Sequence, residues 1–69
     1  MESIGNRLKT ERKKQNLTQV QISSMLKITQ ATYNGYERDK HLPDIVTLCK
    51  LADILKTSTD YLLGRYTKQ

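Results

Sequence analysis

Residues 18–37, TQVQISSMLKITQATYNGYE, contain two helical patterns separated by only a few residues. Thr18 followed by Gln21 is an S/T-x-x-Q capping pattern, in which the hydroxyl and the amide each satisfy a free backbone N–H at a helix start. The first helix continues through Leu26. Thr29 is a second cap candidate and follows after two more residues. The stretch therefore predicts two short helices joined by a tight turn.

The second of these helices, residues 30–37, has two faces of different chemistry. At about 100° per residue, one side carries Thr32, Tyr33 and Tyr36, and the other carries Gln30, Ala31, Asn34 and Gly35. An ordinary surface helix more often presents Lys, Glu and Arg. Small and amide side chains instead permit close approach to base edges, where amides pair with adenine and a methyl meets thymine. A sparsely charged solvent face is the alternative interpretation.

Three further helices are predicted around this pair, and each has a polar cap candidate and a helical pattern. Their ranges are residues 3–15, 45–55 and 59–63, with Ser3, Asp44 and Ser58 as caps and Gly64 closing the last. Residues 38–44 read as a charged loop that contains the only proline. The chain is therefore expected to be all-helical.

The helix at residues 45–55 is expected to be a core helix. Its apolar stripe consists of Ile45, Leu48, Leu51, Ala52 and Leu55. Cys49 lies beside that stripe, and no basic residue or histidine is expected near it. We therefore interpret Cys49 as a small packing residue and not as a reactive thiol.

A buried ion pair is expected between the first helix and the end of residues 30–37. Ile4, Leu8 and Arg12 are spaced four apart on the inward side of the first helix. An inward-pointing guanidinium needs a partner because an unpaired buried charge is costly. Glu37 is the candidate partner, and a solvated Arg12 is the alternative.

Length and charge are consistent with one small basic domain. The 69 residues suffice for one domain, expected as an ordered core at 3–64 and a tail at 65–69. The net charge is +5, and residues 1–43 carry eight Lys and Arg against four Asp and Glu. A phosphate-bearing partner suits this balance, although many small basic domains do not bind nucleic acid.

Several classes of protein are disfavoured by the sequence. No apolar run approaches transmembrane length and the N-terminus lacks an apolar signal segment, so a cytoplasmic location is expected. One cysteine and one histidine cannot make a conventional zinc site. No paired nucleophile and base and no phosphate-binding glycine loop is recognisable. We therefore expect no metal, no cofactor, no small-molecule ligand and no enzymatic activity.

Four segments resemble the lambda-repressor-like, Cro/cI-type helix-turn-helix family, also called the XRE family. They are IGNRLKTERKKQNLTQ, ISSMLKITQATYNGYER, LPDIVTLCKLADIL and STDYLLG, in the order and spacing of that family, and they cover nearly the whole chain. The resemblance implies a compact all-α, five-helix domain with the helix-turn-helix at its second and third helices. It also implies that the third helix lies in the DNA major groove.

The resemblance assigns roles to individual residues. Base-reading positions are expected at Gln30, Ala31, Asn34 and Gly35. Phosphate contacts are expected from Gln19, Thr29, Lys40 and His41, and also from Tyr33, whose ring is expected to pack while its hydroxyl reaches the rim. Arg12 and Glu37 match a pair that forms a buried salt bridge in several relatives, which agrees with the inference from spacing.

The chain departs from the family where relatives often carry glycine. These positions hold Asn16, Lys27 and Asp39. Asn and Asp tolerate a left-handed backbone, whereas Lys27 would pay on the order of 1 kcal/mol. A locally different turn is the alternative there. Gly35, where relatives often carry a long polar side chain, costs roughly 1 kcal/mol relative to Ala inside a helix.

The leading hypothesis is a sequence-specific transcriptional regulator, a repressor that binds a pseudo-palindromic operator in double-stranded DNA as a homodimer. Dimerisation could use the last helix and tail, through Leu62, Leu63 and Tyr66, or could occur only on DNA. The chain could also be a fragment of a longer repressor. The competing hypothesis is a protein-interaction module or antitoxin-like partner, with Val20 and Met25 as exposed contacts.

Overall fold

The computed structural model describes residues 2–65, which contain five α-helices and no strand. The helices are α1 (Ile4–Lys14), α2 (Gln19–Leu26), α3 (Gln30–Glu37), α4 (Ile45–Leu55) and α5 (Thr59–Leu63). All five lie where the sequence predicted helices. Most of the expected tail, including Tyr66, lies outside the described residues.

Polar caps explain where each helix begins. The five N-cap side chains each accept a hydrogen bond from the backbone N–H three residues on, and they are Ser3, Thr18, Thr29, Asp44 and Ser58. At α2 the capping box is complete. The Gln21 N–H donates to Thr18 Oγ1 at 3.0 Å, and the Thr18 N–H donates to Gln21 Oε1 at 2.8 Å. The predicted cap pattern is therefore confirmed.

Left-handed residues end three of the helices and shape two of the loops. Lys27, Lys56 and Gly64 are C-caps with φ of 59°, 57° and 78°, and Asn16 and Asp39 each have φ of 58°. Lys27 thus takes the conformation that glycine usually supplies, so the turn keeps that geometry at a cost of about 1 kcal/mol. The left-handed conformation of Lys56 was not predicted.

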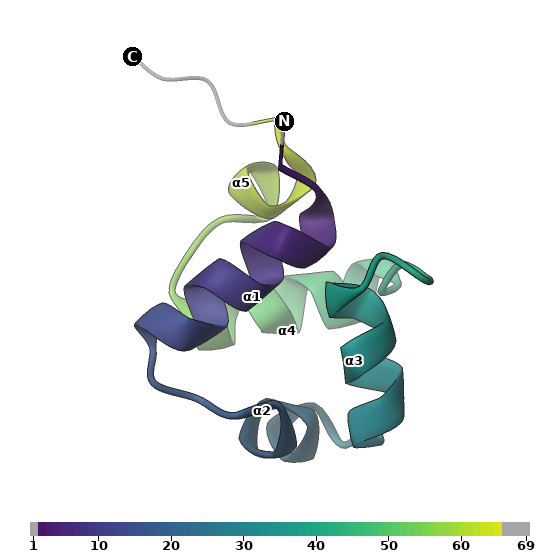
Figure 1. Cartoon of the computed structure of the whole chain (residues 1–69). Coiled ribbons are helices and arrows are strands. Elements are labelled where there is room, and N and C mark those ends of the chain that lie inside the picture. The colour runs from purple at the N-terminus through teal and green to yellow at the C-terminus, as the bar shows by residue number, and fades with distance from the viewer. Residues whose placement is uncertain (1, 66–69) are drawn as a thin grey trace.

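The helices enclose one hydrophobic core. Figure 1 shows α1 in front of α4, α5 near the start of α1, and α2 and α3 meeting at their short connection. Every helix contributes to the core, whose buried members are Leu8, Ile22, Leu26, Tyr33, Tyr36, Leu48, Leu51, Ala52, Leu55 and Leu62. Because both α2 and α3 bury one face in this core, their outer faces are held in a fixed relation to each other.

Two predictions about α4 were wrong. Ile45 is 79% exposed and Cys49 is also exposed, whereas the other four members of the stripe are buried. Ile45 is the first residue of α4 and follows a largely exposed loop, so no helix covers it. Cys49 is turned about 100° from Leu48 and lies beyond the edge of the buried stripe. Neither residue belongs to the core.

Residues 2–65 contain neither a helix that could span a membrane nor a cluster of side chains that could hold a metal ion. None of the helices there is long and apolar enough to cross a bilayer. The same residues contain no group of three or more His, Cys, Asp or Glu side chains arranged to hold a metal ion.

Candidate nucleic-acid interface

A three-residue turn, Lys27 to Thr29, connects α2 to α3. The Lys27 N–H donates to the Ser24 carbonyl at 3.1 Å, and the Ile28 N–H donates to the Ser23 carbonyl at 3.0 Å. Ile28 packs against the core, and Thr29 caps α3. These contacts fix the direction in which α3 leaves the turn.

A buried ion pair joins α1 to the end of α3. Arg12 Nε lies 2.6 Å from Glu37 Oε2, and Arg12 Nη2 donates to Glu37 Oε1 at 3.2 Å. The third contact of the guanidinium is Nη1 donating to the Leu17 carbonyl at 2.8 Å. Both charged side chains are buried, so Arg12 is not solvated, and the ion pair that the spacing predicted is present.

The surroundings of Glu37 keep its carboxylate ionised. Burial alone would raise the pKa of Glu37, but hydrogen bonds from Arg12, Tyr33 and Gln19 outweigh it, and the pKa is lowered. The hydrogen bond to Glu37 in turn raises the pKa of Arg12. Removing either partner would leave an uncompensated buried charge, which typically costs about 3–5 kcal/mol.

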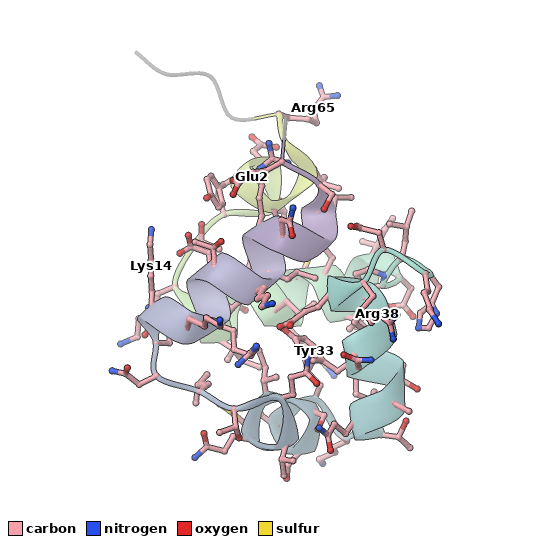
Figure 2. The ribbon with its side chains drawn as sticks, in the orientation of Figure 1. Glu2, Lys14, Tyr33, Arg38 and Arg65 are labelled. Carbon is pink, nitrogen blue, oxygen red and sulfur yellow. The ribbon has the colours of Figure 1, made fainter. Side chains whose placement is uncertain are left out.

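Tyr33 lies inside the protein and cannot contact a phosphate. It is 0% exposed, and its hydroxyl donates to Glu37 Oε2 at 2.6 Å. Figure 2 shows the residue directed from α3 into the space between the helices. The ring packs in the core as expected, but the expected phosphate role was wrong, because the hydroxyl meets the carboxylate of Glu37 one helical turn later. Burial, followed by the hydrogen bond to Glu37, raises the pKa of Tyr33.

The side-chain amide of Gln19 also faces inward. Its Nε2 donates to Glu37 Oε1 at 3.0 Å and to Asn34 Oδ1 at 3.1 Å. These contacts use both amide hydrogens, whereas a phosphate oxygen can only accept. The Gln19 side chain therefore has no amide hydrogen left to donate to a phosphate, which conflicts with the phosphate contact expected of it. The backbone N–H of Gln19, in the first turn of α2, has no intrahelical acceptor.

The outer face of α3 consists of Gln30, Ala31 and Asn34. Gln30 and Ala31 are exposed and Asn34 is half-buried. Gly35 was expected on this face but is buried, because the imidazole of His41 occupies the space where a Cβ would lie.

His41 packs on α3 through two interactions. Its Nε2 lies 3.1 Å from the Thr32 carbonyl oxygen, and its ring is edge-on to Tyr36 at 5.3 Å. Because a carbonyl oxygen only accepts, Nε2 carries the hydrogen. A phosphate contact through Nδ1 would therefore require the imidazolium form.

Polar and basic groups flank the two ends of α3. Thr29 and Lys40 are exposed, and the Thr29 hydroxyl lies 2.9 Å from Thr32 Oγ1. Arg38 is exposed at the C-terminal end of α3 (Figure 2). The sequence reasoning did not single out Arg38, although a basic residue directly after the predicted helix was a usable signal.

The helix-turn-helix family matches residues 8–62 of this chain. The chain belongs to that family. The HTH-type transcriptional regulator ImmR of Bacillus subtilis (strain 168) is 44% identical over 63 residues, which are 91% of this chain and 50% of ImmR. The cryptic phage CTXphi transcriptional repressor RstR of Vibrio cholerae serotype O1 is 40% identical over 63 residues, which are 91% of this chain and 56% of RstR. The chain thus spans about half the length of these curated relatives.

A solved structure of the family has the same fold. The P22 c2 repressor protein, in complex with the synthetic operator 9T, matches with a TM-score of 0.86 and 28% identity. The match covers 91% of this chain and 96% of that chain. It confirms the predicted fold class, a compact five-helix domain of the lambda-repressor-like type.

Proposed function

We propose that this domain binds double-stranded DNA and regulates transcription, with α3 in the major groove. The observation that carries the proposal is the outer face of α3, which is polar or small at Gln30, Ala31 and Asn34, while its inner face is anchored in the core. A helix about 10–12 Å in diameter fits a major groove about 12 Å wide only when its outward side chains allow close approach.

The relatives support the same activity. ImmR is a transcriptional regulator, RstR is a transcriptional repressor, and the P22 c2 repressor is bound to an operator. We extend this activity to the present chain as a repressor that uses no cofactor and performs no catalysis. We also propose a cytoplasmic location, because the protein must reach DNA.

The contacts divide into two classes. Gln30, Ala31 and Asn34 would meet base edges, and Thr29, Arg38, Lys40 and protonated His41 would meet phosphates. Within residues 2–65, no hydrogen bond engages the Gln30 side chain, so its amide is available to donate and accept at adenine. Backbone N–H groups at the start of α2 would add a phosphate contact in place of the Gln19 amide.

Two copies of the domain would bind a pseudo-palindromic operator. Three exposed apolar side chains, Leu42, Ile45 and Val46, follow α3 within residues 42–46, and we propose that they contact a second copy. The expected contact through α5 is less favourable because Leu62 is buried in the core, which leaves Leu63 as the exposed apolar residue of that helix.

The first test is selection of bound duplexes from a random DNA pool at near-physiological salt. We expect enrichment of an imperfect palindrome whose half-sites lie about 10 base pairs apart, because two-fold related helices enter successive major grooves on one side of the duplex. Retention of duplexes without any common motif would contradict the proposed function.

Binding of variants to the enriched operator and to random DNA then distinguishes residues that contact bases from residues that contact phosphates. Gln30→Ala should cost roughly 1 to 3 kcal/mol and relax the preference at one base pair, whereas Lys40→Ala should weaken binding to all sequences. Lys40→Ala should also reduce the slope of log affinity against log salt by about one unit. Equal losses on operator and random DNA for Gln30→Ala would argue against base reading.

The alternative of a protein-interaction module rests on Val20 and Met25, which are exposed on α2 as expected. Five residues apart, they point about 140° away from each other and do not form one patch. The two functions are separated by measuring affinity for the selected operator at several salt concentrations. A DNA-binding regulator should bind this duplex more tightly than random DNA, and its affinity should fall as salt rises. If affinity for that duplex did not exceed affinity for random DNA, the interaction module would be favoured.

A further inference from the structure

A chain of hydrogen bonds runs from the buried carboxylate of Glu37 to the outer face of α3. Glu37 Oε1 accepts from Gln19 Nε2 at 3.0 Å, and the same nitrogen donates to Asn34 Oδ1 at 3.1 Å. The chain therefore links the core to one of the three side chains on that outer face.

The chemistry of Glu37 determines which way both amides point. An ionised carboxylate can only accept, so the Gln19 atom that faces it must be the nitrogen. That nitrogen has two hydrogens and no acceptor capacity, so the Asn34 atom that faces it must be the oxygen. The assignment follows from the donors and acceptors and does not depend on distinguishing amide oxygen from nitrogen directly.

The remaining end of the Asn34 amide, Nδ2, points to the exterior. No hydrogen bond within residues 2–65 engages Nδ2. Among these residues, no buried side-chain nitrogen or oxygen lacks a hydrogen-bond partner, so Nδ2 must reach solvent. Position 34 consequently presents two N–H donors outward, while its acceptor is turned toward α2.

We propose that Gln19 is a positioning residue that holds the Asn34 amide as a hydrogen-bond donor, so that Asn34 selects guanine at the base pair it meets. This inference rests on the proposed function. A freely rotating Asn pairs with adenine through one donor and one acceptor side by side. Gln19 withdraws the acceptor, and guanine is the base that offers two acceptors, O6 and N7, at the major-groove edge.

The test begins with Asn34→Ala, which locates the base pair at which the variant no longer distinguishes the four bases. Affinity is then measured for four operator duplexes that differ only at that base pair. Wild type should prefer guanine there, and Gln19→Leu should reduce the ratio of guanine to adenine affinity by roughly tenfold because the amide is free to turn. The preference at the base pair read by Gln30 should not change. A uniform loss on all four duplexes, or a wild-type preference for adenine, would overturn the proposal.

A second variant keeps the inner contact and changes only the outward group. Asn34→Asp still accepts from Gln19 but presents acceptors to the base, so the preference should move from guanine toward cytosine, whose N4 donates. Retention of guanine preference in Asn34→Asp would refute the donor role.

Side-chain amide hydrogen exchange in the free protein tests the hydrogen-bond chain without DNA. The amide hydrogens of Gln19 should exchange more slowly than those of exposed Gln30, and Gln19→Leu should alter the Asn34 amide signals. Equal exchange at Gln19 and Gln30 would overturn the proposal. A different result would be slow exchange at Gln19 together with equal affinity of the wild-type protein for all duplexes. That result would refute the proposed DNA-binding function, and the selection of guanine with it.

Discussion

Lys27 holds a backbone conformation that disfavours any side chain with a Cβ. Its φ of 59° ends α2 and begins the turn to α3, and its side chain is exposed. Lys27→Gly should therefore raise the free energy of unfolding by about 1 kcal/mol, measured by urea denaturation. Lys50→Gly, on the exposed side of α4, is the matched control and should lower it by about 1 kcal/mol. Destabilisation by both substitutions would contradict the strain at Lys27.

At the scale of elements, the close approach of α1 to α3 depends on Gly5. A Cβ at this position would overlap the backbone carbonyls of Tyr36 and Glu37, which cannot move as a side chain can. Gly5→Ala should therefore destabilise the domain by about 1–3 kcal/mol, although Ala is the better helix former. A thermal melt should show this as a fall of at least about 4 °C in Tm.

Asn6→Ala is the control for that substitution, because Asn6 is the exposed neighbour of Gly5 in α1. Its melting temperature should stay close to that of wild type. A rise in Tm for Gly5→Ala, as helix propensity alone would give, would mean that α1 and α3 can separate at little cost.

The close approach of α1 to α3 also brings the Gly5 N–H within 2.9 Å of Asp39 Oδ1, to which it donates a hydrogen bond. The sequence reasoning missed this contact.

At the scale of the whole molecule, if two copies pair on an operator as proposed, one of two exposed apolar surfaces lies between them. Ile45→Glu should reduce the ratio of affinity for a duplex with two half-sites to affinity for a duplex with one, because a charge would be buried between copies. Leu63→Glu adds the same charge on α5 and should leave the ratio unchanged. A ratio of affinities avoids the general effect of an added negative charge on DNA binding. If Leu63→Glu alone lowered it, pairing through α5 would be favoured.

The fold was predictable because its signals are local. A cap such as Thr18 or Ser58 and a left-handed residue such as Asn16 act on backbone groups within a few positions, so the sequence predicts where helices begin and end. The apolar spacing within each helix likewise predicts which side is buried. The ion pair of Arg12 with Glu37 was predictable because a charge in an apolar stripe demands a partner.

By itself, the sequence determined the five helices, the turn between α2 and α3, and the chemistry of Gln30 and Ala31. Only the tertiary structure decided that His41 covers Gly35, that the Tyr33 hydroxyl stays inside, and that the Gln19 amide turns toward Glu37. Each of these outcomes depends on which groups from other parts of the chain reach the same space. Spacing along one helix carries no information about those partners, so the direction of these polar groups emerges only after the helices have packed.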